Sequence, residues 1–299
     1  MFTLVLLALA DTTVGVVAMR LAASLAARHG AGFAVQHVSG PLSQEGGCVL
    51  RLPGEADLAA RRAEVEALCR VAMPVGLTSD VMLAAGFVHV EVLKTARLLG
   101  PDLLVLGGLD EVERCRRELT GSATKAALVI AAAAPCPVLV VPSNAPMPSV
   151  PFQRVLAATD LSFSAEAVLG VAARLAACER ASLRAFHALP QPSNQPGHGL
   201  ERELDRSRDR LAFLARSLPL VSHMDVAARE GDPSVEILKD ARESQADLIV
   251  LAADRYGQDS LIPGRVLDGA RCAVLLVGPQ APAFLAAQPE SAVAAEARG

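Results

Sequence analysis

The sequence predicts an α/β protein made of two copies of one unit, each an open parallel sheet with helices on both faces. Two observations carry this prediction: an internal repeat, and a regular alternation of short apolar runs with amphipathic segments. The matched pairs share an offset of 145 residues: Gly86 and Gly231 (231 − 86), Lys94 and Lys239 (239 − 94), Asp102 and Asp247 (247 − 102). Since no gap interrupts this match, the two copies are expected to share one fold.

The best-matched part of each copy reads as a turn, a helix and a buried strand. In the second copy the predicted helix carries apolar side chains at Val235, Leu238 and Ala241, a stripe that one helix face would bury. The following strand is a continuous apolar run, Leu248 to Leu251, behind the single aspartate Asp247. Such a run is typical of a parallel strand that helices cover on both faces.

Length and composition exclude several classes of partner. A chain of 299 residues fits two domains of common size. The 28 basic and 32 acidic residues give a formal charge of −4, which provides no general attraction for nucleic acid or anionic lipid. Aromatic residues make up 3% of the chain and tryptophan is absent, so stacking platforms for single strands are missing. We therefore expect no nucleic-acid partner, no membrane partner, and a core of Ala, Val and Leu.

The cysteines indicate a reducing compartment. Six of them are scattered without a C-x-x-C pair or zinc-ligand spacing: Cys48, Cys69, Cys115, Cys136, Cys178 and Cys272. This pattern predicts buried thiols and a cytoplasmic protein. The run from Phe2 to Ala10 is similar to a signal-peptide core, but it has no basic flank and recurs internally as Val155 to Asp160. We interpret it as a first strand.

The first copy alternates strands and helices throughout. The predicted strands are Leu4–Leu9, Phe33–Val38, Val81–Ala84, Leu103–Leu106 and Val138–Val141, and the predicted helices are Val14–Arg28, Glu55–Ala72, Val88–Leu99 and Ser122–Ala133. The apolar run from Ala126 to Val141 is broken by Pro135 and Pro137, so it predicts a helix, a turn and a strand and not a membrane span. This alternation implies right-handed crossovers and a parallel sheet.

The second copy repeats the order after a linker. Residues 142–151 contain four prolines and predict a stiff, exposed connection. The predicted strands are Val155–Ala158, Leu183–Phe186, Met224–Ala228, Leu248–Leu251 and Val274–Val277, with helices over Ala165–Cys178, Leu200–Ser217 and the stretch after Gly231. Residues 280–299 show no pattern and are predicted to be a disordered tail. The expected domains are therefore residues 1–143 and 151–279.

The candidate binding residues follow the strands. Open parallel sheets bind ligands beyond the carboxyl ends of their strands, which in the first copy bring up Asp11, Val38 and the pair Gly107-Gly108. Gly121-Ser122 opens a helix thirteen residues after Gly108. Glycine lets the backbone approach a ligand closely, and helix N-terminal amides beside a hydroxyl suit phosphate oxygens. The intervening arginines could add counter-charge: Arg114, Arg116 and Arg117.

Structural explanations of the same residues stay open. Gly121-Ser122 could only start a helix, with the arginines as a solvated face. The strand-end aspartates Asp11 and Asp160 could serve only as helix caps. His37 and His187, at equivalent strand ends, fit polar residues at the edge of the core better than metal ligands. The sequence contains no P-loop, no nucleophile elbow and no His-Glu-x-x-His motif, so no catalytic site is predicted.

Taken together, residues 1–279 resemble a tandem universal stress protein, with two copies of that family's α/β unit. The residues that carry the resemblance are Thr159-Asp160-Leu161-Ser162 and more loosely Asp11-Thr12, the Gly231-Asp232-Pro233 turn, the strands after Asp102 and Asp247, and Ala134 to Val141. The resemblance implies two flavodoxin-like, adenine-nucleotide-hydrolase-like sheets. It also suggests that the last strands, Val138–Val141 and Val274–Val277, lie at sheet edges and bring the halves together as an intramolecular pseudo-dimer, with a homodimer as an alternative assembly.

ATP-binding members of that family carry Gly-x-x-Gly, nine residues, then Gly-Ser or Gly-Thr. Gly108, Gly121 and Ser122 fit that spacing, whereas Glu111 stands in place of the second glycine. The second copy departs further, because Ala252-Ala253 replaces both strand-end glycines. Its segment after the strand is also nine residues shorter: Cys272 follows Ala253 by 19 residues (272 − 253), whereas Cys136 follows Gly108 by 28 (136 − 108).

The resemblance implies a stress-response regulatory protein that binds an adenine nucleotide in its N-terminal half. ATP is the implied cofactor, and the implied contacts are Asp11, Val38, Gly107, Gly108, Gly121 and Ser122. A high-turnover enzyme is not implied, although slow ATP hydrolysis stays open. The alternative, from another class, is a nucleotide-free interaction module of the same fold.

Overall fold

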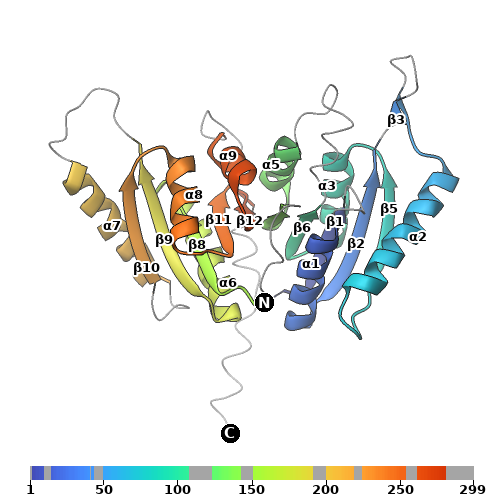
Figure 1. The fold of residues 1–299 in the computed structure, drawn as a ribbon, viewed down its shortest axis with the longest axis horizontal. Coiled ribbons are helices and arrows are strands. Elements are labelled where there is room, and N and C mark those ends of the chain that lie inside the picture. The colour runs from blue at the N-terminus through green and yellow to red at the C-terminus, as the bar shows by residue number, and fades with distance from the viewer. Residues whose placement is uncertain are drawn as a thin grey trace, which may run out of the picture.

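A computed structural model describes residues 2–9, 15–40, 42–43, 50–107, 123–142, 151–190, 200–218, 224–253 and 261–280 of the chain. A ten-stranded sheet runs through both copies, and helices pack on each of its faces (Figure 1). Its strand order is β10-β9-β8-β11-β12-β7-β6-β1-β2-β5. The N-terminal copy supplies one end of this sheet and the C-terminal copy supplies the other.

The N-terminal half contributes five parallel strands, in the order β5-β2-β1-β6-β7. They are β1 (Leu4–Leu9), β2 (Gly32–Ser39), β5 (Asp80–Ala85), β6 (Leu103–Gly107) and β7 (Val138–Val141). Its helices are α1 (Val16–His29), α2 (Glu55–Ala72), α3 (Val88–Leu99) and α5 (Ala123–Ala133). A short antiparallel ribbon that the sequence analysis did not predict pairs β3 (Leu42–Ser43) with β4 (Leu50–Arg51), apart from the main sheet.

The C-terminal half repeats this arrangement. Its strands are β8 (Arg154–Ala158), β9 (Ser182–Leu189), β10 (Met224–Glu230), β11 (Leu248–Ala252) and β12 (Ala273–Val277), and its helices are α6 (Ala165–Glu179), α7 (Leu200–Arg216), α8 (Pro233–Glu243) and α9 (Leu261–Gly269). The order β10-β9-β8-β11-β12 is the order of the first half, strand for strand. The prediction that the two halves share one strand order is confirmed.

The two halves meet through their last strands. β7 and β12 are antiparallel neighbours, with Leu139 paired with Leu275 at the centre of the register. Each strand would be an unpaired apolar edge in its own half, and the pairing removes both edges. The prediction that these strands join the halves is confirmed. Since Leu139 and Leu275 are also equivalent in the repeat (275 − 139 = 136), the join has the form of a local two-fold axis.

The sheet separates two apolar cores. In β1 the odd-numbered residues Val5, Leu7 and Leu9 belong to the core under α1, α2, α6 and α7, while Leu6 and Ala8 belong to the core under α3, α5, α8 and α9. This alternation explains the continuous apolar run in the sequence, since both faces of the strand are covered. Both cores extend across the join, with Leu139 and Leu275 in the first and Val138 and Val274 in the second.

Some local predictions are wrong. Val235 is 55% exposed, and α8 instead buries Ile237, Asp240 and Ala241, because Asp240 turns toward two arginines on the sheet. Cys178 is exposed, whereas Cys69 and Cys136 are buried as predicted. In α1 the N-cap position belongs to Gly15, which has no side chain with which to cap the helix. Among the helices described, none is long and apolar enough to cross a membrane.

Candidate functional site

β1 and β6 end level at the carboxyl edge of the first half, and β2 runs two residues further, to Ser39 (39 − 37). Leu9, the last residue of β1, is paired with His37 of β2 on one side and with Gly107 of β6 on the other. The chain runs outward from β1 to β2 and β5 in one direction, and through β6 to β7 in the other. The sheet therefore has its topological switch point between β1 and β6, which is where open α/β sheets bind ligands.

Val38 supplies backbone to this edge. The whole residue is 2% exposed and its side chain belongs to the core under α3 and α5, so the side chain is not available to a ligand. The neighbouring carbonyl of Ser39 accepts a hydrogen bond from the amide of Gly86 at 3.0 Å, which ties the end of β2 to the turn before α3. The predicted contact through the Val38 backbone is compatible with this position.

Gln36 is a polar residue of this region that the sequence prediction missed. It is 1% exposed, and its Nε2 donates to the backbone carbonyl of Glu91 in α3 at 3.2 Å. Its Oε1 is buried and has no hydrogen-bond partner among the residues that the structure describes. The sequence feature that could have indicated Gln36 was its amide side chain within the largely apolar strand β2.

Gly107 has a structural reason to be glycine. A Cβ at this position would overlap the Cβ of Ala18 in α1. The missing side chain lets α1 approach β6 closely, and α1 packs against both β1 and β6. The glycine predicted to approach a ligand is thus required by helix–strand packing. The equivalent residue in the second half is Ala252 (107 + 145), and the residue equivalent to Ala18 there is Val168 (18 + 150).

The remaining predicted contacts lie outside the described residues. These are Asp11, Gly108, Gly121 and Ser122, together with Glu111 and the three arginines of the same loop. In sequence, Asp11 comes two residues after the end of β1 and Gly108 directly after the end of β6. The structure therefore brings together the strands that carry these residues, β1 and β6, as direct neighbours.

The corresponding edge of the second half is held by local hydrogen bonds. Asp160 accepts a hydrogen bond from the amide of Ser162 at 2.8 Å, and the Thr159 hydroxyl accepts one from the amide of Leu161 at 3.0 Å. Leu161 has φ of 62°, so the turn is tight. α6 begins only at Ala165, so the alternative reading of Asp160 as a helix cap is wrong.

The two strand-end histidines are buried. His37 is 4% exposed and His187 is 7% exposed, and Nδ1 of His187 lies 2.8 Å from the backbone carbonyl of Thr159. Within the described ranges, no group of three or more His, Cys, Asp or Glu side chains could hold a metal ion. Burial raises the pKa of the Cys136 thiol to about 12, and that of the equivalent Cys272 likewise to about 12. Both thiols stay protonated at neutral pH, so they are poor nucleophiles.

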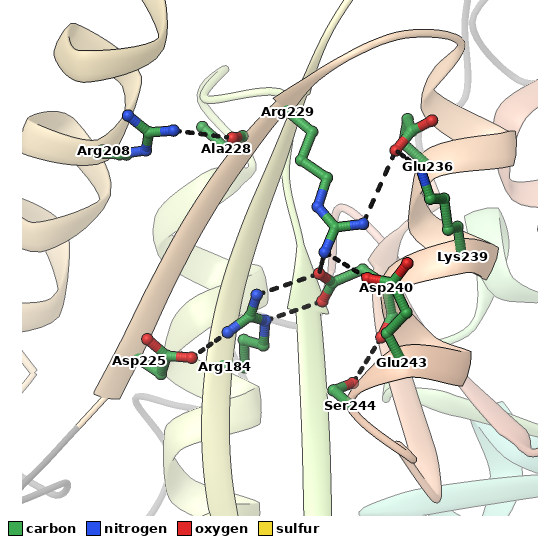
Figure 2. Close-up of polar contacts among 10 residues, drawn as sticks. All are labelled: Arg184, Arg208, Asp225, Ala228, Arg229, Glu236, Lys239, Asp240, Glu243 and Ser244. Carbon is green, nitrogen blue, oxygen red and sulfur yellow. Dashed lines mark hydrogen bonds and ion pairs between the residues drawn. The ribbon is translucent and has the colours of Figure 1, made fainter.

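A polar network binds α8 to the outer strands of the second half (Figure 2). Its centre is Asp240, fully buried, which contacts Arg184 of β9 and Arg229 of β10 at 2.9 and 3.0 Å. The outer carboxylates are Asp225, which bonds Arg184, and Glu236 and Glu243, which face Arg229. The hydrogen bonds that Arg184 donates to Asp240 raise the pKa of Arg184 above its ordinary value. The equivalent residues in the first half are Ala34, Ala84 and Thr95, so the network belongs to one half alone.

Comparisons with known proteins agree with this architecture. A sequence model of the universal stress protein family matches residues 1–142 and again residues 151–278. No curated protein sequence matches the chain. Among solved structures, a universal stress protein from Archaeoglobus fulgidus DSM 4304 is 18% identical, with a TM-score of 0.60 over 92% of this chain and 98% of that one. A putative universal stress protein from Pseudomonas aeruginosa UCBPP-PA14 is 16% identical, with a TM-score of 0.59 over 95% of each chain. A protein of unknown function from Pseudomonas aeruginosa PAO1 is 15% identical, with a TM-score of 0.58 over 95% of each chain.

Proposed function

The chain belongs to the universal stress protein family, and from this premise we propose that it is a stress-response regulatory protein that binds an adenine nucleotide, ATP, in its N-terminal half. The observation that supports the proposal most directly is the register of Leu9 between His37 and Gly107. It makes the carboxyl ends of β1 and β6 level at the switch point, beside the last residues of β2. A ligand there would meet backbone from three strands at once.

The proposed contacts follow from this edge. Asp11 and the Val38 backbone would bind the nucleoside, while Gly107, Gly108, Gly121 and Ser122 would lie near the phosphates. Main-chain amides and a helix N-terminus suit phosphate oxygens, because the N–H groups donate hydrogen bonds and the helix dipole favours a negative charge there. Glu111 adds a carboxylate to the same loop, so we expect modest affinity. A cytoplasmic location accords with a nucleotide ligand and with the free cysteines.

The second half is a poorer phosphate site by the same criteria. α9 contains Pro263 in its first turn, and proline has no amide hydrogen to donate. Ala252 stands where the first half has Gly107, and the connection between β11 and β12 is nine residues shorter than its counterpart. We therefore assign nucleotide binding to the first half alone.

Calorimetric titration with ATP tests the assignment. We expect the intact chain to bind, Gly121→Val to weaken binding by about tenfold to a hundredfold, and Asp160→Ala to bind like the intact chain. One lost charge-assisted phosphate contact is worth about 1.5 to 3 kcal/mol, which sets that range. If Asp160→Ala lost binding while Gly121→Val kept it, the site would lie in the C-terminal half, and the assignment to the N-terminal half would be overturned.

A nucleotide-free interaction module is the second candidate function. The packing of Gly107 against Ala18 favours it, since the glycine is then explained without a ligand. Mass spectrometry of the purified, denatured protein distinguishes the two candidates. A co-purified adenine nucleotide would support binding. Its absence, together with no calorimetric signal from any of the three chains, would support the nucleotide-free module.

A further inference from the structure

The surface between the two halves is built from equivalent residues of the two copies. We call this surface the seam: it comprises β7, β12, Phe2, Phe152 and the C-terminal parts of α1 and α6. A small, wholly apolar cavity in the seam is lined by three matched pairs, Phe2 with Phe152 and Leu25 with Leu175 (offset 150) and Leu139 with Leu275 (offset 136), together with Leu103, Pro137 and Val171. Apart from polar groups, each half therefore presents nearly the same face to the other, as in a two-fold dimer.

One pair of equivalent positions breaks this symmetry, with a histidine on one side and a glutamate on the other. His29, the last residue of α1, and Glu179, the last residue of α6, are also 150 residues apart (179 − 29). They face each other across the seam, with Nε2 of His29 2.8 Å from Oε1 of Glu179. Nε of Arg28 donates to the other carboxylate oxygen at 3.2 Å. Arg28 is matched in the second copy by Cys178, so the first half brings two basic side chains and the second half one carboxylate.

The Glu179 carboxylate and the His29 ring are withdrawn from water, whereas the Arg28 side chain is exposed. The Glu179 side chain is 0% exposed, that of His29 is 9% exposed, and that of Arg28 is 40% exposed. The ring of Phe2 packs edge-on against His29, with centroids 4.9 Å apart. A carboxylate buried to this degree requires a cationic or hydrogen-bonding partner, and here both partners come from the other half of the chain.

The same geometry penalises the pairing of like halves. If two C-terminal halves met through this surface, Glu179 would face a second Glu179 in place of Arg28 and His29. If two N-terminal halves met, Arg28 and His29 would face their own copies with no acceptor. The matched apolar pairs contribute little to a choice among these pairings, because the same side chain stands on both sides. The charges can discriminate, since like-charge contacts suppress wrong partners.

We propose that Arg28, His29 and Glu179 make the seam selective for unlike halves, so that the N-terminal half accepts the C-terminal half and rejects its own kind. The surface thus has a defined partner, the other half of this chain. It would direct the chain to close on itself and would discourage two chains from associating through like halves.

Exchanging the two helix ends tests the proposal in the full-length chain. Arg28→Cys with His29→Glu gives both ends the Cys-Glu pair and reproduces the contact of two C-terminal halves. Cys178→Arg with Glu179→His gives both ends the Arg-His pair and reproduces the contact of two N-terminal halves. All four substitutions together restore unlike ends in the reversed order. Urea unfolding of these three variants and the wild type measures the coupling between the ends.

We expect each like-ended variant to lower the folding equilibrium constant by about a hundredfold or more, and the reversed variant to return within about tenfold of the wild type. If the reversed variant instead shows the product of the two separate losses, the ends act independently and the proposal is overturned. A like-ended variant that does not fold still leaves the reversed variant decisive. Arg61→Glu with Glu64→Arg reverses a half-exposed pair on α2 and serves as the control, with little expected change.

Discussion

The guanidinium of Arg184 holds the carboxylate of Asp240 by two hydrogen bonds, Nε to Oδ2 at 2.9 Å and Nη2 to Oδ1 at 3.1 Å. Arg229 reaches the same buried carboxylate from the edge strand (Figure 2). We expect Asp240→Ala to lower the free energy of unfolding by about 2 to 3 kcal/mol, because both arginines lose their buried acceptor while keeping their outer carboxylates. Urea unfolding of the intact chain measures this loss.

The matched control is Glu243→Ala in the same network. Glu243 bonds Arg229 at 2.6 Å, but its side chain is 51% exposed, so water can replace it. We expect this variant to unfold close to the wild type. Equal losses in the two variants would show that burial of Asp240 does not determine the strength of the network.

Gly107 and Ala18 should show strong coupling. We expect Gly107→Ala to destabilise the chain by about 1 to 3 kcal/mol, because the new Cβ overlaps that of Ala18 and forces α1 away from β6. Adding Ala18→Gly should remove part of that loss, although glycine within a helix itself costs about 1 kcal/mol. Thermal unfolding of both single variants and the double variant gives the coupling. Strictly additive losses would contradict the close packing at this point.

Asp232 should make α8 sensitive to acid. The Ser234 hydroxyl, followed by the amides of Val235 and Ser234, lowers the pKa of the Asp232 carboxyl at the helix N-terminus. A lowered pKa in the folded state adds stability above the unfolded-state value of 3.8, and that stability is lost as the pH falls through the folded-state pKa. We expect Asp232→Ala to cost about 1 kcal/mol at neutral pH, and the difference from the wild type to shrink at lower pH.

Urea unfolding of both proteins at neutral pH and at progressively lower pH provides the measurement. Asp160→Ala is a suitable control, because Asp160 bonds the Ser162 amide but caps no helix. A loss in Asp232→Ala that stays constant down to acid pH would contradict the role of the charged carboxylate.

The order of elements could be predicted because repetition and apolar patterning act along the chain. Most predicted strands and helices agree with the structure within a few residues, and the shared strand order follows from the constant offset. The join between β7 and β12 was predicted from the resemblance to the universal stress family, and the apolar edge of each strand supported it. The prediction that α8 buries Val235 was wrong. The face that this helix buries depends on Arg184 and Arg229, which lie in the strands β9 and β10.

The candidate site was less accessible to sequence reasoning. A glycine that follows a strand fits ligand approach and helix packing equally well, and only the position of Ala18 shows that Gly107 serves packing. Gln36 showed no pattern that linked it to Glu91 in α3. The pairing of His29 with Glu179 is visible in the sequence, since aligning the copies places a histidine and a glutamate at equivalent positions. Its meaning depends on the two-fold geometry of the seam.

The antiparallel pairing of β7 with β12 also affects the chain while it is being made. β7 ends at Val141 and its partner begins at Ala273, so 132 residues (273 − 141) must be synthesised before the pair can form. At roughly 5 to 20 residues per second, the apolar edge of β7 waits on the order of ten seconds on the ribosome. During that interval the nascent N-terminal half offers an open strand to neighbouring nascent chains, and its protection depends on how quickly translation delivers β12.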